Sequence, residues 1–225
     1  GMNIDNIIIK LLERGVRIAG RAPITLFGAE DFMLVITERV IDYGSVSDVV
    51  RFGIVYREMP GIYMGFRRIY GFTNVREELK GIMPPYTTGY EDRCMVITQV
   101  GIDYNNDDAV ADFITNFVNN DADKLVDSIR SLLTYPVNED ALTSWIQKIR
   151  ERLPTMRMRL WANRHLARYR SIYGMNANTL LQTLMFYINV LLRTRYRDEA
   201  RLLNDEANRL LQLPSKYVWE LTHKI

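Results

Sequence analysis

The chain has 225 residues, of which 48% are hydrophobic and 25% are charged, so it can bury a sizeable core and does not have the composition of a disordered chain. Its only cysteine, Cys94, excludes an internal disulfide framework and is typical of a reducing compartment. The longest apolar run, residues 184–192, is interrupted by Asn189 and is far shorter than the roughly 20 residues of a membrane-spanning helix. We therefore expect a cytoplasmic protein without a membrane partner.

The N-terminal part of the chain mixes helical and strand patterns. Residues 3–16 carry apolar side chains at three- and four-residue steps, which predicts an amphipathic helix capped by Asn3 or Asp5. The short apolar run 24–27 predicts a strand, and the apolar positions of residues 30–43 predict a second helix.

A β-hairpin is predicted at residues 49–72. Segments 49–57 and 62–72 are rich in β-branched and aromatic residues, and Pro60 and Gly61 supply the turn between them. Arginines alternate with aromatic residues along both segments, a composition also found on sheets that bind RNA. Aromatic residues of a strand more often belong to a core. Residues 94–102 predict a further strand.

From residue 107 onward the apolar pattern has the period of helices. Asp107, Asp121, Asn138 and Asn178 stand where helix caps are expected, and Pro154 suits a first helical turn. The predicted helices cover residues 107–118, 121–133, 138–152, 154–173, 178–197, 198–211 and 214–222. Residues 178–192 are apolar almost all round, so this helix should lie at the centre of a bundle.

These patterns predict an α+β protein in two parts. Residues 2–104 should form a small α+β domain that contains the hairpin 49–72, with a sheet of about three or four strands. Residues 105–225 should form a larger all-α bundle around the helix 178–197.

The predicted helix 154–173 carries the most informative surface pattern. Arg157, Arg164 and Arg168 lie within about 40° of one another around the helix axis, with Trp161 beside them. We call these four residues the basic strip. Guanidinium groups around an aromatic ring suit phosphate contacts and base stacking, although a solvated helix face has a similar composition. Further arginines expected to contact nucleic acid are Arg193, Arg195, Arg197, Arg67 and Arg68.

Two resemblances to enzyme families rest on short motifs. Arg159 and His165 form R-x5-H, which resembles the motif of the helical HEPN-family ribonucleases and would imply a metal-independent ribonuclease. Residues 24–31 followed by Ser47-Asp48-Val49-Val50 resemble the nucleotidyltransferase pattern, but Ala29 and Val50 replace its serine and its second metal-binding aspartate. That resemblance implies an inactive relative. We therefore assign no catalytic residue and expect no metal or cofactor.

Charge is divided unevenly along the chain. Residues 1–139 hold 14 Lys and Arg against 20 Asp and Glu, a balance of −6, and residues 140–225 hold 15 against seven, a balance of +8. An acidic segment, residues 103–127, contains Asp103, Asp107, Asp108, Asp112, Asp121, Asp123 and Asp127. These carboxylates could cap helices or face the arginines of the same chain or of another copy.

Together these features predict a non-enzymatic protein that binds RNA or DNA through the basic and aromatic surface of the bundle and the hairpin. The first alternative is an assembly protein that forms a homo-oligomer through its acidic and basic segments. The second is the HEPN-like ribonuclease or the inactive nucleotidyltransferase relative that the two motifs imply.

Overall fold

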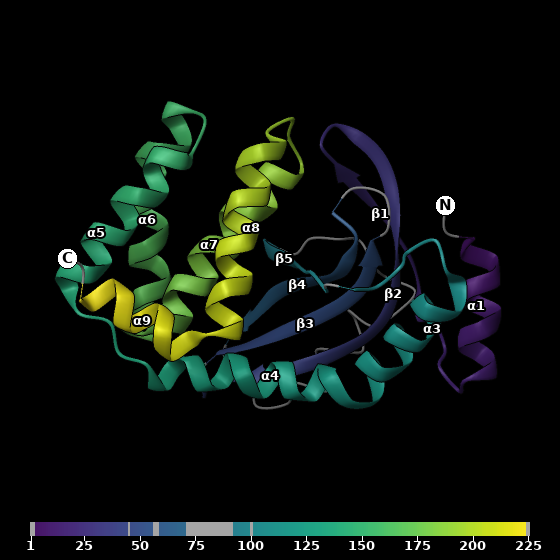
Figure 1. Cartoon of the computed structure of the whole chain (residues 1–225). Helices are drawn as coiled ribbons and strands as arrows, with labels where there is room; N and C mark the ends of the chain where they lie inside the picture. Colours follow the sequence, from purple (N-terminus) through teal and green to yellow (C-terminus); the bar gives the residue numbers. More distant parts are fainter. Residues whose placement is uncertain (1–2, 45, 56–58, 71–91, 100, 224–225) are drawn as a thin grey trace. The chain divides into compact units, whose positions relative to one another are not determined.

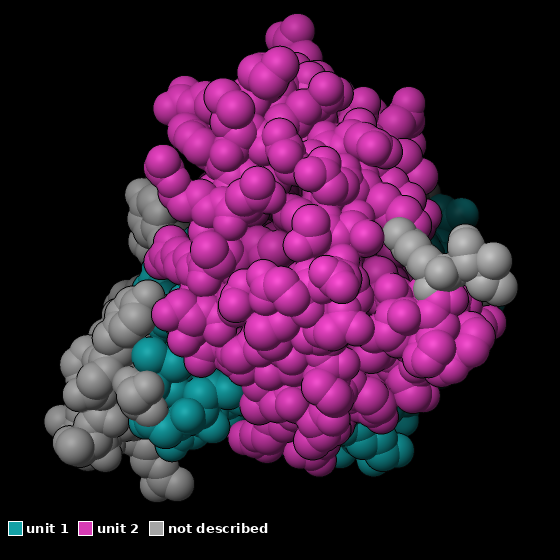
Figure 2. Space-filling view, turned by 90° about the vertical axis from the view of Figure 1, so that its left-hand side faces the viewer, with its two compact units in different colours: residues 1–126 teal, residues 127–225 magenta. Residues whose placement is uncertain are grey.

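The computed structural model describes residues 3–44, 46–55, 59–70, 92–99 and 101–223 (Figure 1). The chain divides into two compact units, which we call the sheet unit (residues 1–126) and the helical unit (residues 127–225); Figure 2 colours them separately. The predicted α+β class is confirmed, because an antiparallel sheet precedes a series of helices. The domain boundary predicted between residues 104 and 105 falls inside the sheet unit, in the segment that joins the last strand to the helix α3.

Within the described residues, the strands form one antiparallel sheet in the order β1-β2-β3-β4-β5. Their bounds are β1 Gly20–Leu26, β2 Ala29–Asp42, β3 Val46–Val55, β4 Gly61–Tyr70 and β5 Arg93–Ile97. The predicted hairpin is confirmed as β3 and β4, in which Val55 lies opposite Gly61. Residues 71 and 72 and the predicted turn residue 58 lie outside the described part.

The helix predicted over residues 30–43 is wrong, because this segment forms β2, the longest strand of the sheet. Its register with β3 shifts between Val35 and Thr37, which makes Ile36 the extra residue of a β-bulge. The bulge breaks the two-residue alternation by which strands are recognised, and Met33 to Ile36 are all buried. A continuous apolar run without alternation does not separate a buried strand from a helix.

A buried ion pair joins two strands of the sheet unit. The carboxylate of Asp48 on β3 lies 3.1 Å from the guanidinium of Arg93 on β5, and both side chains are fully buried. Arg68, which lies opposite Asp48 on β4, places its guanidinium 3.6 Å from the same carboxylate. Buried charges are energetically costly unless they are paired. Moving these strands apart would leave the charges buried without partners, so the ion pairs hold the strands in this arrangement.

Helices of the sheet unit are held by contacts with each other and with the strands. The predicted first helix is confirmed as α1 (Ile4–Glu13), which Asn3 caps by accepting a hydrogen bond from the Asn6 amide. It packs against α3 (Asp107–Asn116). A π-turn, η1 (Phe117–Asp121), joins α3 to α4 (Ala122–Ser131), so Asp121 lies inside a continuous helical run and does not cap a new helix. Phe117 packs edge-to-face on Phe52 of β3.

The helical unit is organised around α7 (Ala177–Leu192), as predicted. The other elements are η2 (Leu132–Thr134), α5 (Glu139–Arg152), α6 (Met156–Tyr173), α8 (Arg197–Gln212) and α9 (Pro214–Thr222). Thirteen residues of α7 are buried, and η2, α6 and α8 all contact it. Nine of the buried residues are apolar, as a helix buried on nearly every side requires. The four buried polar residues lie in the first half of the helix, where Gln182 donates to Asn178 and Thr183 donates to the Thr179 carbonyl.

Four further predicted helix ends need correction. Asn106 caps α3 instead of Asp107, by accepting a hydrogen bond from the Ala109 amide. Thr155 caps α6 with its hydroxyl on the Met158 amide, so Pro154 precedes the cap and does not stand in the first turn. Asn176 caps α7 instead of Asn178, which lies two residues further along and is buried in the first turn. The helix predicted to continue to residue 197 ends at Leu192, five residues before α8 begins.

The first prediction concerns the buried centre of the helical unit. Leu184 on α7 is 0% exposed, so Leu184→Ala should lower the free energy of unfolding by about 2–5 kcal/mol through lost burial and the cavity left behind. Leu202→Ala on α8 is the matched control, because that leucine is 51% exposed and should change stability by about 0.5 kcal/mol or less. Urea unfolding measures both, and equal effects would contradict the central position of α7.

The second prediction concerns the buried ion pair of the sheet unit. Asp48→Asn keeps the side-chain shape but removes the buried charge that Arg93 and Arg68 share, which leaves Arg93 with the partly exposed Asp92, so unfolding should become easier by about 3–5 kcal/mol. Asp5→Asn removes a carboxylate that pairs with Arg21 at 3.3 Å but is 87% exposed, and should cost no more than about 1 kcal/mol. If Asp48→Asn unfolds at the same urea concentration as Asp5→Asn, the ion pair does not stabilise the sheet.

Candidate functional site

The helix α6 is held rigidly enough to present a defined surface. Its inner face consists of Ala162, Leu166, Tyr169 and Tyr173, all of which are buried. At its C-terminal end Gly174 has a φ of 91°, a conformation that favours glycine, and its amide closes the last turn on the Arg170 carbonyl. Because the inner face of α6 is buried, the opposite face has a fixed orientation.

The basic strip lies on the exposed side of α6. Arg157, Arg164 and Arg168 are exposed, as the spacing predicts, and Trp161 is half-buried beside them. The guanidinium of Arg157 stacks over the Trp161 ring with its carbon 4.4 Å from the ring centroid. Trp161 therefore presents a ring face that Arg157 already covers, and the stacked pair acts as one planar, positively charged surface.

Among the described residues, none of these three arginines pairs with a carboxylate. Other arginines of the helical unit do: Arg170 lies 2.7 Å from Glu139, Arg152 lies 3.7 Å from Glu206, and Arg209 pairs with Glu220. The unit therefore neutralises several of its arginines by carboxylates, and the positive charge of the basic strip is left facing solvent.

Arg193, Arg195 and Arg197 lie in and after the turn that joins α7 to α8, and all are exposed. Arg193 donates a hydrogen bond to the Asn189 side chain. Helices α6 and α7 are consecutive and antiparallel, and Tyr187 of α7 reaches the Met158 carbonyl near the start of α6. This turn therefore lies at the same end of the helical unit as the start of α6 (Figure 1).

The hairpin arginines have different surroundings. Arg68 is 4% exposed beside Asp48, and Arg67 is half-buried on the other face of β4. The aromatic residues Phe52, Tyr63 and Phe66 are buried in the sheet unit. These residues form core and buried ion-pair contacts, so the described part of the hairpin does not present an open aromatic and arginine surface.

The carboxylates of the acidic segment contact other groups of the same chain. Lys10 and Arg14 of α1 contact Asp108, and Arg14 also contacts Asp112, with the closest pairs at 2.8 Å. Hydrogen bonds from Lys10 and Arg14 hold the pKa of Asp108 below its usual value. Asp107 accepts a hydrogen bond from Asn6 at 2.7 Å.

The remaining acids of the segment also have partners in the chain. Arg39 contacts Asp123 at 2.7 Å, and Arg130 contacts Asp127 at 3.3 Å. Asp121 accepts a hydrogen bond from the Asn116 side chain, and Asp103 accepts one from the Asn105 amide. All seven carboxylates are thus engaged with groups other than the basic strip.

Arg159 and His165 engage different partners. The Nε of Arg159 donates to the Leu153 carbonyl at 2.7 Å, and His165 Nδ1 lies 2.9 Å from the Tyr187 hydroxyl. The imidazole stacks on Phe186. Burial lowers the pKa of His165, and the charges of Arg168 and Arg164 lower it further. The structure therefore gives the two side chains separate structural contacts on a regular helix and does not direct them at one group.

Within the described ranges, no cluster of three or more His, Cys, Asp or Glu side chains is arranged to hold a metal ion. Asp48, the one carboxylate that the nucleotidyltransferase pattern retains, is buried against Arg93.

Helices in the described part are too short or too polar to cross a membrane.

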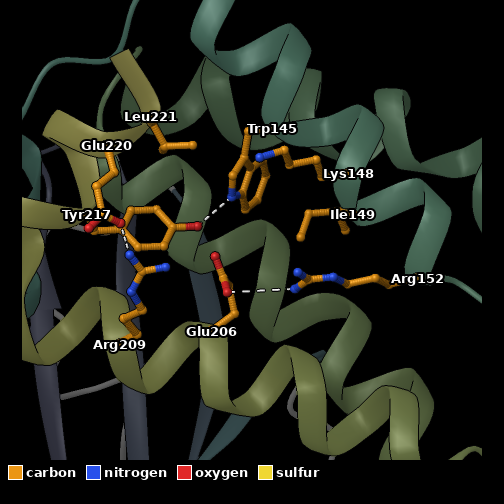
Figure 3. A pocket seen from close by; sticks show the side chains of 9 residues that line it. All are labelled: Trp145, Lys148, Ile149, Arg152, Glu206, Arg209, Tyr217, Glu220 and Leu221. Carbon is orange, nitrogen blue, oxygen red and sulfur yellow. Dashed lines mark hydrogen bonds and ion pairs between the residues drawn. The ribbon is translucent and has the colours of Figure 1, made fainter. Parts of the chain in front are cut away.

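Sequence analysis did not identify the pocket shown in Figure 3, which lies between α5, α8 and α9 of the helical unit. Its aromatic residues are Trp145 and Tyr217, and the Trp145 indole donates a hydrogen bond to the Tyr217 hydroxyl at 2.6 Å. The two residues are separated by 72 positions, so no local pattern could have paired them. The available signal was the amphipathic pattern of each helix, which does not determine which helices meet.

Comparison with protein-family models, with curated protein sequences and with solved structures found no significant match to this chain.

Proposed function

We propose that this protein binds RNA or DNA and that the basic strip of α6 is its principal contact surface. The observation that carries the proposal is the set of three exposed arginines on one side of a rigid helix, none of them paired with a carboxylate among the described residues. Phosphate groups at regular spacing along a nucleic acid strand provide the anions that such a row of guanidinium groups would bind.

The charge of the whole helical unit supports an anionic partner. Residues 127–225 hold 16 Lys and Arg against nine Asp and Glu, a balance of +7. Arg193, Arg195 and Arg197 add positive charge at the end of the unit where α6 begins. An extended positive field of this kind raises the rate at which a polyanion associates, in addition to the direct contacts.

The stacked pair of Arg157 and Trp161 supports a nucleic acid over a simple anion. A guanidinium group over an indole adds a second planar group at this position, on which an unpaired base can stack. Arg164 and Arg168 lie about one and two turns beyond Trp161 on the same side of the helix, so they would contact successive phosphates that follow the stacked base in one direction along the strand. This arrangement favours a single strand, whose bases are free to stack.

The internal pairing of the acidic segment weighs against assembly by charge complementarity. Lys10, Arg14 and Arg39 already contact its carboxylates. Arginines of a neighbouring copy would therefore bind carboxylates whose charge is already balanced in part by cations of the same chain. The basic strip has no such competing partner among the described residues, so an external anion is the partner that it fits.

The third prediction tests the proposed contacts through their salt dependence. Each phosphate contact releases counterions, so Arg164/Arg168→Ala should flatten the slope of log affinity for single-stranded RNA against log salt by about 1.4 units, or about 0.7 for each arginine. Fluorescence anisotropy at several salt concentrations measures the slope. Arg157 is left in place because its side chain packs on Trp161 and its loss could disturb the helix surface.

Arg130/Arg170→Ala is the matched control, since it removes the same charge from the same unit at positions that pair with Asp127 and Glu139. Its slope should stay close to that of the wild type. If both variants flatten the salt-dependence slope equally, only the net charge of the unit matters. If neither variant flattens the slope, the basic strip does not contact the nucleic acid. Sedimentation of the same variants tests the alternative that the basic strip is an assembly surface. In that case Arg164/Arg168→Ala would dissociate an oligomer while RNA binding stayed unchanged.

The fourth prediction separates binding from catalysis. Because Arg159 and His165 engage Leu153 and Tyr187, purified protein should leave labelled single-stranded RNA intact in the absence of divalent metal. Gel analysis over several hours measures this. RNA cleavage that is present in the wild type and lost in His165→Ala would contradict the proposal and establish the HEPN-like ribonuclease instead.

A further inference from the structure

The pocket between α5, α8 and α9 has a volume of about 250 Å³ and lies entirely in the helical unit. Figure 3 shows side chains converging on it from all three helices. Trp145, Ile149 and Tyr217 are each at most 2% exposed, so its apolar wall is part of the packed core and is fixed in shape. Leu221 adds a further apolar side chain. Such a fixed wall lets a ligand bind without first ordering the pocket.

A chain of hydrogen bonds and ion pairs fixes the polar side of the pocket. Trp145 donates a hydrogen bond to the Tyr217 hydroxyl, and the Glu206 carboxylate is the neighbouring charged group of that hydroxyl. Arg152 lies 3.7 Å from that carboxylate. Burial and the neighbouring Glu206 raise the pKa of Tyr217, so its hydroxyl keeps its proton. Glu206 is therefore held by its own network and is not available to bind a cationic ligand.

The second carboxylate of the pocket is also paired. Glu220 contacts Arg209, whose guanidinium lies over the Tyr217 ring, 5.4 Å from its centroid. The pocket thus has two carboxylates, each with an arginine of the pocket as partner. One cation is left, Lys148 of α5, which is exposed and has no carboxylate partner among the described residues. The pocket carries one unmatched positive charge beside an aromatic and aliphatic wall.

We propose that this pocket binds a small organic anion, with its carboxylate or phosphate group on Lys148 and its compact apolar body against Trp145, Ile149 and Leu221. The volume is below the roughly 300–1,000 Å³ of pockets for drug-sized ligands, so the ligand is smaller than a nucleotide. This site is separate from the basic strip and goes beyond nucleic-acid binding. Arg152 and Arg209, at the edge of the same pocket, add donors that suit either acidic group.

The fifth prediction uses probes that share one ring and differ in charge. Phenyl phosphate and phenylacetate carry the two acidic groups, benzyl alcohol is neutral, and benzylamine is cationic. Calorimetric titration of the full chain should show one saturable site for at least one of the anions, with affinity at least about tenfold above that of benzyl alcohol. The stronger of the two anions identifies phosphate or carboxylate as the group recognised. Absence of binding by both anions, or equal binding of the neutral probe, overturns the proposal.

Variants then assign the binding to the pocket. Lys148→Gln should weaken anion binding by about tenfold or more, and Lys148→Glu should reverse the preference toward benzylamine. Arg150→Gln removes the same charge from the same helix at a position that does not line the pocket and should bind like the wild type. Arg164/Arg168→Ala should also bind the anion normally, which separates this site from the basic strip. Unchanged binding by Lys148→Gln would overturn the proposal.

Discussion

Burial of α7 determines the surface that the helical unit can offer. Because α7 buries thirteen of its residues, its neighbours must turn their apolar faces inward to cover it. In α6 this consumes the side occupied by Leu166, Tyr169 and Tyr173, so the rotational position of the helix is fixed and its arginines are directed to solvent. The basic strip is thus a consequence of the packing of the core, and its arginines cannot turn inward to find a buried carboxylate.

The ion pairs distinguish the exposed arginines of the basic strip from the other cations of the chain. In the sheet unit the acidic segment is neutralised by α1 and by Arg39, over distances that permit direct hydrogen bonds. In the helical unit Arg152, Arg170 and Arg209 have carboxylate partners, whereas the basic strip has none in the described part. Exposed pairs contribute little to stability individually. Their relevance here is that they separate the arginines with a carboxylate partner from those of the strip, which have none in the described part.

The sequence predicted those features that depend on local patterns. The cap at Asn138, the hairpin of β3 and β4, and the buried position of α7 follow from residue preferences and from hydrophobic periodicity. The strand β2 was misassigned because the bulge at Ile36 interrupts its alternation. Caps at Thr155 and Asn176 were missed because several neighbouring residues could serve equally well.

Features that depend on distant contacts could not be predicted. Asp48 and Arg93 are 45 positions apart, and nothing in either strand indicates that a buried charge has a partner. The pocket requires α5, α8 and α9 to meet, which their individual patterns leave open. For the candidate site, the sequence predicted which arginines share a side of α6, whereas the stacking of Arg157 on Trp161 and the pairing of the acidic segment required coordinates.

The central claim is that α6 contacts nucleic acid, and photo-cross-linking maps that contact directly. Single-stranded RNA carrying 4-thiouridine would be bound to the full chain, irradiated and digested with trypsin, which cleaves after Arg159 and Arg164 and releases the segment that contains Trp161. The account predicts that mass spectrometry finds the main cross-link on this peptide or on the turn that follows α7. Cross-links confined to the sheet unit, or none above the level given by a protein that does not bind RNA, would contradict it.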